Sequence, residues 1–422
     1  MFIYFLLIRI AALFGHRKAR MLVKGQAETL KSGLMNGEAN KSFNDAIWIH
    51  AASVGEFEQA RPLIERLRMK GERQKIVVTF FSPSGYEARK NYELVDGVFY
   101  LPFATRRKAR RFLDALKPKM AIFVKYEFWP AYLHELKKRN IPTYSISAIF
   151  RPGQLFFLPW GKQHLKLLKC FTHIYVQDES SRALLERHGV TSVSVSGDTR
   201  FDRVREVMNE GMSVERMNGE GANERLQVIE RFTEGSERVI VAGSTWPKDE
   251  ELLAKYVNNG ETKLILVPHE INEEHLHFIF NLFQGRMVRL STLTMEHRLP
   301  ATDFIAHQAQ VLVIDSIGLL SHIYRYGQVA YIGGGFGVGI HNTIEAAVYG
   351  MPVIFGPNYH HFREAQGLID TGAARSISNY SELEKAMDTA MEQHELIGSK
   401  AAEYVNTELG ATEKIYKELF EI

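Results

Sequence analysis

The sequence lacks several features that would place it in a special class. It contains one cysteine, Cys170, which excludes an intramolecular disulfide framework and a paired-cysteine metal site. Its formal net charge is only +3 at pH 7, and we find no nucleic-acid recognition motif. No apolar run reaches the roughly 20 residues of a membrane-spanning helix. With 45% hydrophobic and 24% charged residues among 422, we expect a globular protein of several domains, in a reducing cytoplasm by default.

The most apolar stretch is residues 1–14 (MFIYFLLIRIAALF), which Arg9 interrupts. Basic residues follow it directly: His16, Arg17, Lys18, Arg20 and Lys24. A cleaved signal peptide carries its charge in front, so this order argues against one. Residues 1–25 instead suit a helix that lies in an anionic membrane interface. The alternative is a helix packed on the core of a domain.

Short β-branched or aromatic runs alternate with helical segments, which predicts parallel strands joined by crossover helices. In the first half these runs are Ile47–Ala51, Ile76–Phe81, Met120–Lys125, Thr143–Ser147, His173–Val176 and Ser192–Val195. In the second half they are Val239–Gly243, Lys263–Val267, Val311–Ile314, Gln328–Ile332 and Val353–Phe355. The pattern weakens over residues 204–237, which we take as an interdomain linker. The sequence therefore predicts two doubly wound α/β domains, residues 26–203 and 238–396, with ligands beyond the carboxyl ends of the strands.

Two carboxylates follow strands of the first domain. Glu56 stands in the run His-Ala-Ala-Ser53-Val-Gly55-Glu56, at the start of an apolar-periodic helix. An ionised carboxylate held there can act as a base; the alternative is that it only caps the helix and neutralises its dipole. Glu127 lies in Lys125-Tyr-Glu127-Phe-Trp-Pro, among aromatic residues that would raise its pKa unless a cation compensates. A structural ion pair is the alternative for Glu127.

A glycine-rich run follows a strand of the second domain: Gly-Gly334-Gly335-Phe-Gly337-Val-Gly, then Ile-His341-Asn342-Thr-Ile-Glu345. Backbone N–H groups of such a loop can approach a phosphate, with Asn342 as the expected N-cap of the next helix. Glu345 suits ribose hydroxyls. The run lies too late in the domain for a nicotinamide dinucleotide fingerprint. A turn that needs glycine only for close packing is the alternative.

Further turns with polar residues follow other strands at the same edges of the two predicted sheets. Taken singly, each indicates only a turn. They include Arg200, Ser244, His269 and Glu364. The adjacent His360 and His361 lie on different faces and have no partner motif, so we predict no metal site.

Together these residues resemble the Kdo transferases, which add 3-deoxy-D-manno-octulosonic acid (Kdo) to a lipid A precursor. The resemblance rests on AASVGE at 51–56 and HNTIEAAVYGMPVIFGP at 341–357, with YEFWP at 126–130, GDTRFD at 197–202 and the hydrophobic-basic N-terminal segment. It implies a GT-B fold of glycosyltransferase family 30, with two Rossmann-like domains facing across a cleft. It also implies a C-terminal helix, residues 397–422, that crosses back to the first domain.

The resemblance assigns roles residue by residue. Glu56 matches the general base and Glu127 a second carboxylate needed for activity, while His341, Asn342 and Glu345 match the nucleotide-binding residues. Among the turn residues, His269 stands where many members have arginine, and Arg200 where lysine is common. The remaining predicted substrate-binding residues are Ser53, Gly55, Ser244, Gly334, Gly335, Gly337 and Glu364. Arg61, Lys125 and Arg200 are the candidate cations for the Kdo carboxylate.

The implied reaction is Kdo transfer from CMP-Kdo to the lipid A precursor (lipid IVA), with inversion and with no metal or other cofactor. The implied location is the cytoplasmic face of the inner membrane, with a lipid surface as partner and neither nucleic acid nor an obligate protein partner. Two segments suit that surface: the basic cluster Arg106–Arg111 and the apolar run Phe156–Trp160. The alternatives are a solvated helix face for the first and a core segment for the second.

Two other functions fit part of the pattern. A sugar-nucleotide 2-epimerase shares the two-domain fold and a carboxylate-rich cleft, but leaves residues 1–25 unexplained. A membrane-associated nucleotide-binding scaffold would need no base at Glu56.

Overall fold

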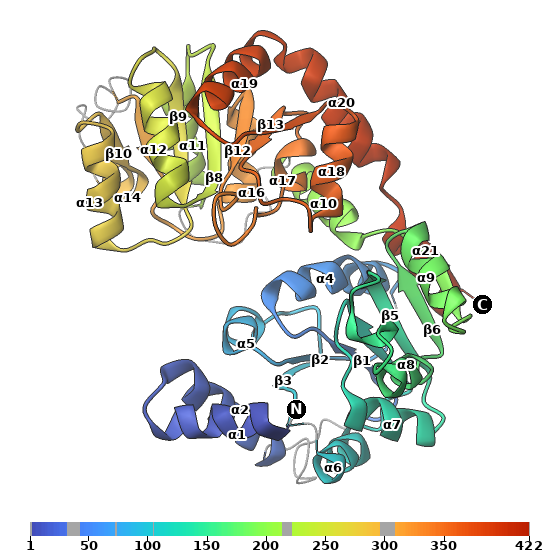
Figure 1. Ribbon diagram of the computed structural model, residues 1–422. Coiled ribbons are helices and arrows are strands. Elements are labelled where there is room, and N and C mark those ends of the chain that lie inside the picture. The colour runs from blue at the N-terminus through green and yellow to red at the C-terminus, as the bar shows by residue number, and fades with distance from the viewer. Residues whose placement is uncertain are drawn as a thin grey trace. The chain divides into compact units, whose positions relative to one another are not determined.

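The computed structural model describes residues 2–31, 43–71, 74–103, 105–212, 222–295 and 309–421. The chain divides into two compact units, one of Met1–Arg203 with Leu409–Ile422 and one of Val204–Glu408. Each unit is built on one seven-stranded sheet of parallel strands, with helices on both faces (Figure 1). The predicted fold class, two doubly wound α/β domains of the GT-B kind, is confirmed.

The N-terminal unit has the strand order β3-β2-β1-β4-β5-β6-β7. Its strands are β1 (Ile47–His50), β2 (Ile76–Phe80), β3 (Gly97–Tyr100), β4 (Met120–Val124), β5 (Thr143–Ala148), β6 (His173–Val176) and β7 (Val193–Val195). Its helices are α1 (Phe2–Leu13), α2 (Arg17–Lys31), α4 (Val54–Met69), α5 (Pro83–Arg89), α6 (Arg106–Leu116), α7 (Pro130–Lys138), η1 (Leu155–Phe157), α8 (Lys162–Leu168), α9 (Glu179–Arg187) and α21 (Ala411–Phe420).

The C-terminal unit has the order β10-β11-β9-β8-β12-β13-β14. Its strands are β8 (Val239–Thr245), β9 (Lys263–Pro268), β10 (Met287–Arg289), β11 (Val311–Val313), β12 (Val329–Ile332), β13 (Val353–Phe355) and β14 (Ala374–Ser376). Its helices are α11 (Ala222–Thr233), α12 (Pro247–Val257), α13 (Glu273–Leu282), α14 (Leu290–Met295), α16 (Leu320–Ile323), η3 (Tyr324–Tyr326), α17 (Ile344–Ala347), α18 (Arg363–Asp370), α19 (Tyr380–Glu392) and α20 (His394–Thr407). Helix α10 (Thr199–Met212) begins in the N-terminal unit and ends in the C-terminal unit.

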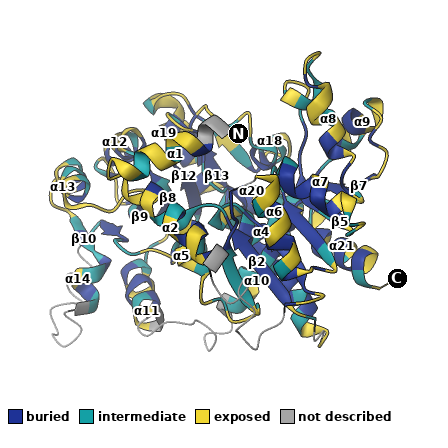
Figure 2. Cartoon of the chain, turned by 90° about the horizontal axis from the view of Figure 1, so that it is seen from below, coloured by how far each residue is buried: buried dark blue, intermediate teal, exposed yellow. Residues whose placement is uncertain are grey.

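The predicted strands are all present, and the structure adds β3, β10 and β14. The added strands are edges of their sheets and only partly buried. The central strands, such as β1 and β2, are buried at every residue, because helices cover both faces of a parallel sheet. Figure 2 shows this contrast, with the central strands dark blue and the outward helix faces yellow.

Two expectations about the connections differ from the structure. The predicted linker at 204–237 contains most of α10 and all of α11, while its residues 213–221 lie outside the described ones. The single helix expected at 397–422 is two helices, α20 and α21, because the chain turns at Gly410 with φ +103°. Both oxygens of Asp202 accept backbone N–H groups there, from Gly410 and Thr412 at 2.7 Å, which fixes the start of α21.

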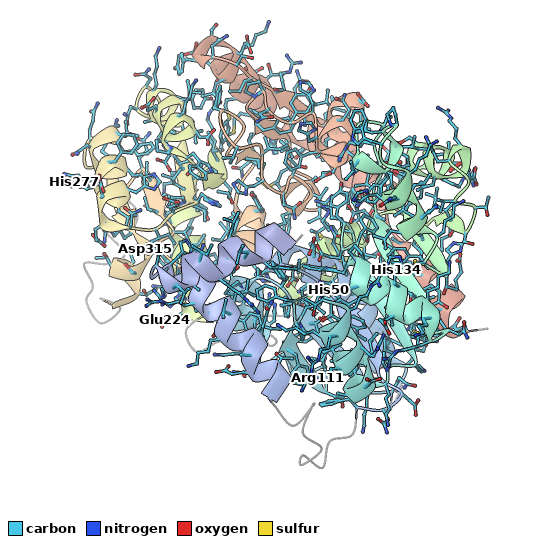
Figure 3. All side chains as sticks on the ribbon, turned by 60° about the horizontal axis from the view of Figure 1, so that its bottom comes forward. His50, Arg111, His134, Glu224, His277 and Asp315 are labelled. Atoms are coloured by element: carbon cyan, nitrogen blue, oxygen red, sulfur yellow. The ribbon has the colours of Figure 1, made fainter. Side chains whose placement is uncertain are left out.

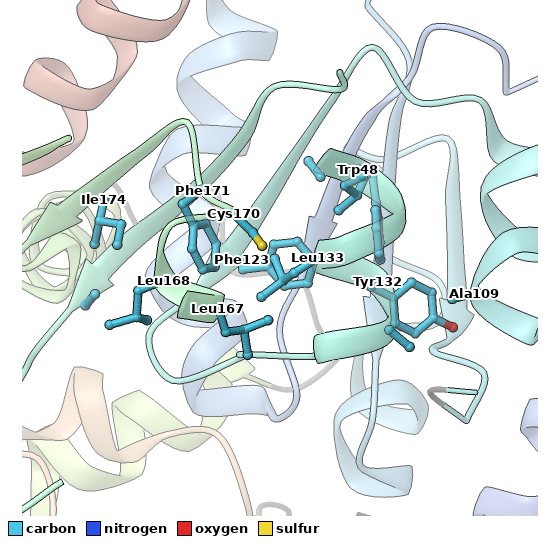
Figure 4. Packing of buried hydrophobic residues seen from close by; sticks show 14 of the residues in the cluster. Trp48, Ala109, Phe123, Tyr132, Leu133, Leu167, Leu168, Cys170, Phe171 and Ile174 are labelled. Carbon is cyan, nitrogen blue, oxygen red and sulfur yellow. The ribbon is translucent and has the colours of Figure 1, made fainter. Parts of the chain in front are cut away.

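The core of the N-terminal unit is aromatic on one face of its sheet. Trp48 of β1 packs against Phe123 of β4 and Tyr132 of α7, with ring centroids 5.2 and 5.6 Å apart (Figure 4). The indole Nε1 of Trp48 donates to Thr79 Oγ1 at 2.8 Å, so this buried polar group is satisfied. The packing fixes the strands whose carboxyl ends carry the candidate site residues.

The N-terminal segment forms α1 and α2, which pack against each other. Within the part of the chain that the structure describes, no helix is both long and apolar enough to cross a bilayer.

Candidate functional site

Glu56 lies in the first turn of α4, directly beyond the carboxyl end of β1. Ser53 is the N-cap, and its Oγ accepts the Glu56 N–H while the Glu56 side chain turns back to the cap. Glu56 Oε2 accepts the N–H groups of Ala52 at 2.6 Å and Ser53 at 3.2 Å. This reciprocal capping box satisfies backbone donors that the helix start leaves open. Among the described residues, Oε1 has no hydrogen-bond partner, so one oxygen is anchored and the other is available for chemistry.

Glu127 follows β4 and is held from two sides. Its Oε2 accepts the indole N–H of Trp129 at 2.5 Å and lies 3.0 Å from Nε2 of His50. His50 is the last residue of β1; its side chain is fully buried, and Figure 3 shows it inside the N-terminal unit. Its Nδ1 lies 3.0 Å from the Thr79 carbonyl oxygen. The structure thus joins His50, Glu56, Glu127 and Trp129 in one group, here called the carboxylate cluster.

The electrostatics of the carboxylate cluster favour a proton acceptor near neutral pH. Burial, and then the negative charge of Glu127, raise the pKa of Glu56 from 4.5 to about 7. The N–H groups of Ala52 and Ser53 and the charge of His50 oppose this rise without cancelling it. A base works best when its pKa is close to the working pH. The geometry therefore allows Glu56 to act as a base as well as to cap α4.

His50 and Trp129 were not among the sequence-predicted site residues. A polar residue that ends an otherwise apolar buried strand, as His50 ends β1, was the available signal for the first. Trp129 gave no such signal, because an aromatic residue before Pro130 is also typical of simple packing at the start of a helix. Pro130 occupies the first turn of α7, where the missing N–H of proline leaves no hydrogen bond unmade.

The three candidate cations lie in different settings. Arg61 pairs with Glu65 at 2.6 Å, and Lys125 lies over the Tyr126 ring, 5.6 Å from its centroid. Arg200 donates to the buried Asp198 at 2.7 and 2.9 Å. Burial alone would raise the pKa of Asp198, but Arg200 and Lys125 hold it below its usual value. Lys125 lies two positions before Glu127 in the sequence.

In the C-terminal unit, three rings form a stack beyond the strand ends. Trp246 follows β8, His269 follows β9, and His341 follows the glycine-rich run after β12. The His269 ring lies 4.7 Å from Trp246 and 4.6 Å from His341, centroid to centroid, with interplanar angles of 20° and 30°. Burial, with the neighbouring His269, lowers the pKa of His341. We call Trp246, His269 and His341 the ring stack.

A buried pair fixes the segment that carries His269. His275 Nε2 lies 2.7 Å from Glu250 Oε2, and its Nδ1 lies 2.9 Å from the carbonyl oxygen of Glu270. Glu250 is fully buried, and its other oxygen accepts the Thr245 hydroxyl at 2.9 Å. Burial raises the pKa of Glu250. Neither His275 nor Glu250 was predicted, because their 25-residue separation hides the contact in sequence.

Asn342 and Glu345 lie together beside the ring stack. Asn342 Nδ2 donates to Glu345 Oε1 at 2.8 Å, and its Oδ1 accepts the N–H of Ile344 at 3.2 Å. The N-cap position belongs to Thr343 rather than to Asn342, and α17 has only four residues. The prediction of Asn342 as N-cap was wrong by one position, although its side chain does bond the first turn.

The glycine-rich run is shaped largely by close packing. A Cβ on Gly335 would lie 2.6 Å from backbone atoms of Gly356, and one on Gly333 would lie 2.3 Å from the Ser244 carbonyl oxygen. The Gly334 N–H donates to the buried Asp249 carboxylate at 2.9 Å, and the Gly337 N–H donates to the Gly334 carbonyl at 3.0 Å. These amides are already bonded within the protein, so the packing alternative explains much of the run.

The glycines therefore differ in what they tolerate. We expect Gly335→Ala to lower the free energy of unfolding by about 1–3 kcal/mol, because backbone must move to admit the new Cβ. Gly337→Ala is the matched control: nothing lies within 4 Å of its Cβ position, and we expect a change within about 0.5 kcal/mol. Urea unfolding followed by circular dichroism measures both. Equal effects of the two substitutions would contradict this packing role.

The remaining predicted residues occupy varied positions. Gly55 is exposed on α4, Ser244 has φ +55° near the end of β8, and Glu364 is 4% exposed in the first turn of α18. In the part of the chain that the structure describes, no cluster of three or more His, Cys, Asp or Glu side chains could hold a metal ion.

The two segments assigned to a lipid surface also differ from each other. Arg106, Arg107 and Arg111 are exposed on α6, and Figure 3 shows Arg111 at the outer edge of its unit. Phe156 and Phe157 pack against the core of the N-terminal unit, whereas Trp160 is 73% exposed. For the two phenylalanines the core alternative fits the contacts.

The relatives of this chain agree with the resemblance read from its motifs. Residues 20–203 match the family model described as 3-deoxy-D-manno-octulosonic-acid transferase (kdotransferase). The 3-deoxy-D-manno-octulosonic acid transferase of Aquifex aeolicus is 26% identical over 354 residues, 82% of this chain and 86% of that protein. The enzyme of the same name from Haemophilus influenzae is 27% identical over 401 residues, 90% of this chain and 87% of that protein. The chain is a Kdo transferase relative.

The likeness to the Kdo transferases extends over both units, and the prediction of a glycosyltransferase enzyme is confirmed. Solved structures show the same fold at lower identity. UDP-GlcNAc 2-epimerase from Neisseria meningitidis has a TM-score of 0.65 at 14% identity, over 89% of this chain and all of that chain. MurG from Acinetobacter baumannii has a TM-score of 0.54 at 13% identity, over 90% of this chain and all of that chain. At such identities the likeness concerns the fold alone, so it does not favour an epimerase.

Proposed function

We propose that the chain transfers Kdo from CMP-Kdo to the lipid A precursor lipid IVA, with inversion at the anomeric carbon. Kinship with the Kdo transferases supports Kdo transfer. The observation that carries the mechanism is the Glu56 carboxylate, anchored by two backbone N–H groups and raised in pKa to about 7 beside Glu127. Such a group is ready to accept a proton at neutral pH.

In the proposed step, a primary hydroxyl of the glucosamine disaccharide attacks the anomeric carbon of Kdo. The new carbon–oxygen bond forms as the bond from that carbon to the CMP phosphate breaks, and CMP leaves with the bonding electrons. The hydroxyl proton passes to Glu56. Glu127 keeps the pKa of Glu56 high, and His50 and Trp129 hold Glu127 in place.

The donor would bind in the C-terminal unit. The flat faces of the ring stack suit a cytosine base, and Glu345 suits ribose hydroxyls, since a carboxylate accepts their hydrogen bonds. Ser244 and the N–H groups of the glycine-rich run that are not bonded internally would face the phosphate. We propose that the transfer needs no metal ion, because backbone N–H groups of the glycine-rich run would stabilise the charge that develops on the leaving CMP phosphate.

The acceptor is acylated, so we propose that the enzyme works at the cytoplasmic face of the inner membrane. Leu7 and Leu13 of α1 are 57% and 80% exposed, and Phe14, directly after the helix, is 87% exposed. Exposed basic residues follow on α2, among them Arg17 and Lys18. Apolar side chains beside basic ones suit an anionic lipid surface. We propose no nucleic acid and no obligate protein partner.

A transfer assay tests this function. The full chain is incubated in detergent with tetra-acylated disaccharide and CMP-Kdo generated in situ, with and without EDTA, and lipid products are weighed by mass spectrometry. We expect one or more added Kdo masses in both arms. A second arm with UDP-GlcNAc alone should yield no 2-epimer. Epimer formation, or CMP binding without any Kdo product, would contradict the proposal.

A further inference from the structure

Helix α1 reaches the carboxyl ends of three strands through one side chain. Phe5 is 8% exposed, while its neighbours Leu6 and Leu7 are 48% and 57% exposed. Its ring centroid lies 4.4 Å from that of Phe103, which follows β3. Among the described side chains of α1, from Phe5 onward, Phe5 is the buried one. The helix therefore packs on the domain at this point and leaves much of its apolar surface exposed.

Two further contacts of Phe5 lead to the carboxylate cluster. Its ring lies 6.4 Å from Phe81, after β2, and 6.3 Å from Trp129, with the Phe5 and Trp129 planes only 6° apart. Phe81 also lies 5.1 Å from Trp129. Phe5 and Phe81 thus hold the indole ring of Trp129 on its apolar side.

The polar side of Trp129 bonds the second carboxylate. Its Nε1 donates to Glu127 Oε2, which in turn lies against His50. The position of an indole ring held by packing on one edge sets the direction of its N–H on the other. Each link from α1 to Glu127 is a direct contact, and Glu127 acts on Glu56 through its charge.

We propose that Phe5 is a positioning residue: α1 forms one side of the active site, and Phe5 keeps Trp129 aimed at Glu127. The helix then has two roles, since its exposed leucines face lipid while Phe5 faces the cluster. The expected effect on kcat rests on the proposed Kdo transfer, whereas the contact between Phe5 and Trp129 does not. The residues that contact catalytic side chains must hold them rigidly, because small displacements of the catalytic groups lower the reaction rate strongly.

The experiment compares Phe5→Ala with Met69→Ala in the full chain. Met69 is 77% exposed at the end of α4 and belongs to no proposed binding surface, so its substitution removes a long apolar side chain without touching Trp129. We expect Phe5→Ala to lower kcat roughly ten- to a hundredfold with the donor KM changed by less than about twofold. Met69→Ala should keep kcat within about twofold, and Phe5→Leu should restore a large part of the loss.

A spectroscopic arm is independent of activity. The protein is labelled with 5-fluorotryptophan, and the ¹⁹F signal of Trp129 is assigned by its absence in Trp129→Phe. We expect Phe5→Ala to shift or broaden this signal while those of Trp48 and Trp246 stay in place. A slower Phe5→Ala enzyme with an unmoved Trp129 signal would overturn the positioning role. Equal effects of Phe5→Ala and Met69→Ala on kcat, or a faster Phe5→Ala enzyme, would also overturn it. A wild-type enzyme without transfer would overturn the proposed function alone, because the ¹⁹F arm still tests the contact.

Discussion

A Glu56→Gln enzyme is expected to lose about a hundred- to ten-thousandfold in kcat, which is the range that general base catalysis contributes. Glutamine keeps the oxygen that accepts the N–H groups of Ala52 and Ser53, so the capping box of α4 can persist. It cannot accept the hydroxyl proton at neutral pH. The loss should therefore appear in turnover rather than in folding, and steady-state kinetics with CMP-Kdo measures it.

Two controls make the result specific. CMP affinity, measured by calorimetry, should not change, since the ring stack and Glu345 belong to the other unit. Glu87→Gln removes the same charge from an exposed position on α5 and should keep kcat near that of the wild type. Transfer by Glu56→Gln at the wild-type rate would remove Glu56 from the mechanism.

The second large effect is on the pH dependence. Glu56 acts as a base only when ionised, and its pKa of about 7 lies above the usual 4.5. Below pH 7 the protonated form dominates, so kcat/KM should fall about tenfold per pH unit and should level off above pH 7. The apparent value belongs to the coupled pair of Glu56 and Glu127.

Removing the charge of Glu127 should move this acid limb. Glu127→Gln deletes the second-largest cause of the raised pKa, so the limb should shift toward lower pH even as the maximal rate falls. Burial remains, so the shift should be partial. Buffer series at constant ionic strength, from pH 5 to pH 9, measure the profile. An unshifted limb in Glu127→Gln would show that the titrating group is not coupled to Glu127.

The central strands of both sheets could be predicted from the sequence, because parallel strands that are buried on both faces are mostly apolar. Strands such as Ile76–Phe80 are visible as uninterrupted β-branched or aromatic runs, and parallel sheets place their carboxyl ends on one edge. The edge strands β3, β10 and β14 were missed because half-buried residues dilute that signal. The break at Gly410 between α20 and α21 was missed, and Asp202, which bonds the start of α21, lies 208 residues from Gly410.

The site was predicted in part for similar reasons. Glu56 carries a local signal, the Ser53 to Glu56 spacing of a capping box before an apolar helix. The contacts that tune it come from another strand: Glu127 and Trp129 meet His50 across 77 and 79 positions of sequence. The glycine-rich run was predicted to bind phosphate, but close packing explains much of it. The sequence does not separate the two, because a tightly packed turn and a phosphate-binding loop both need glycine. Asp249, which takes the Gly334 N–H, lies 85 positions away.

The most direct test of the carboxylate cluster is a titration of Glu56 itself. Side-chain carboxyl carbons are labelled with ¹³C, and the Glu56 signal is assigned by its absence in Glu56→Gln. We predict a midpoint near pH 7 in the wild-type enzyme and a lower midpoint in Glu127→Gln. A wild-type midpoint near the ordinary 4.5 would contradict the claim that burial and Glu127 hold Glu56 ready as the base.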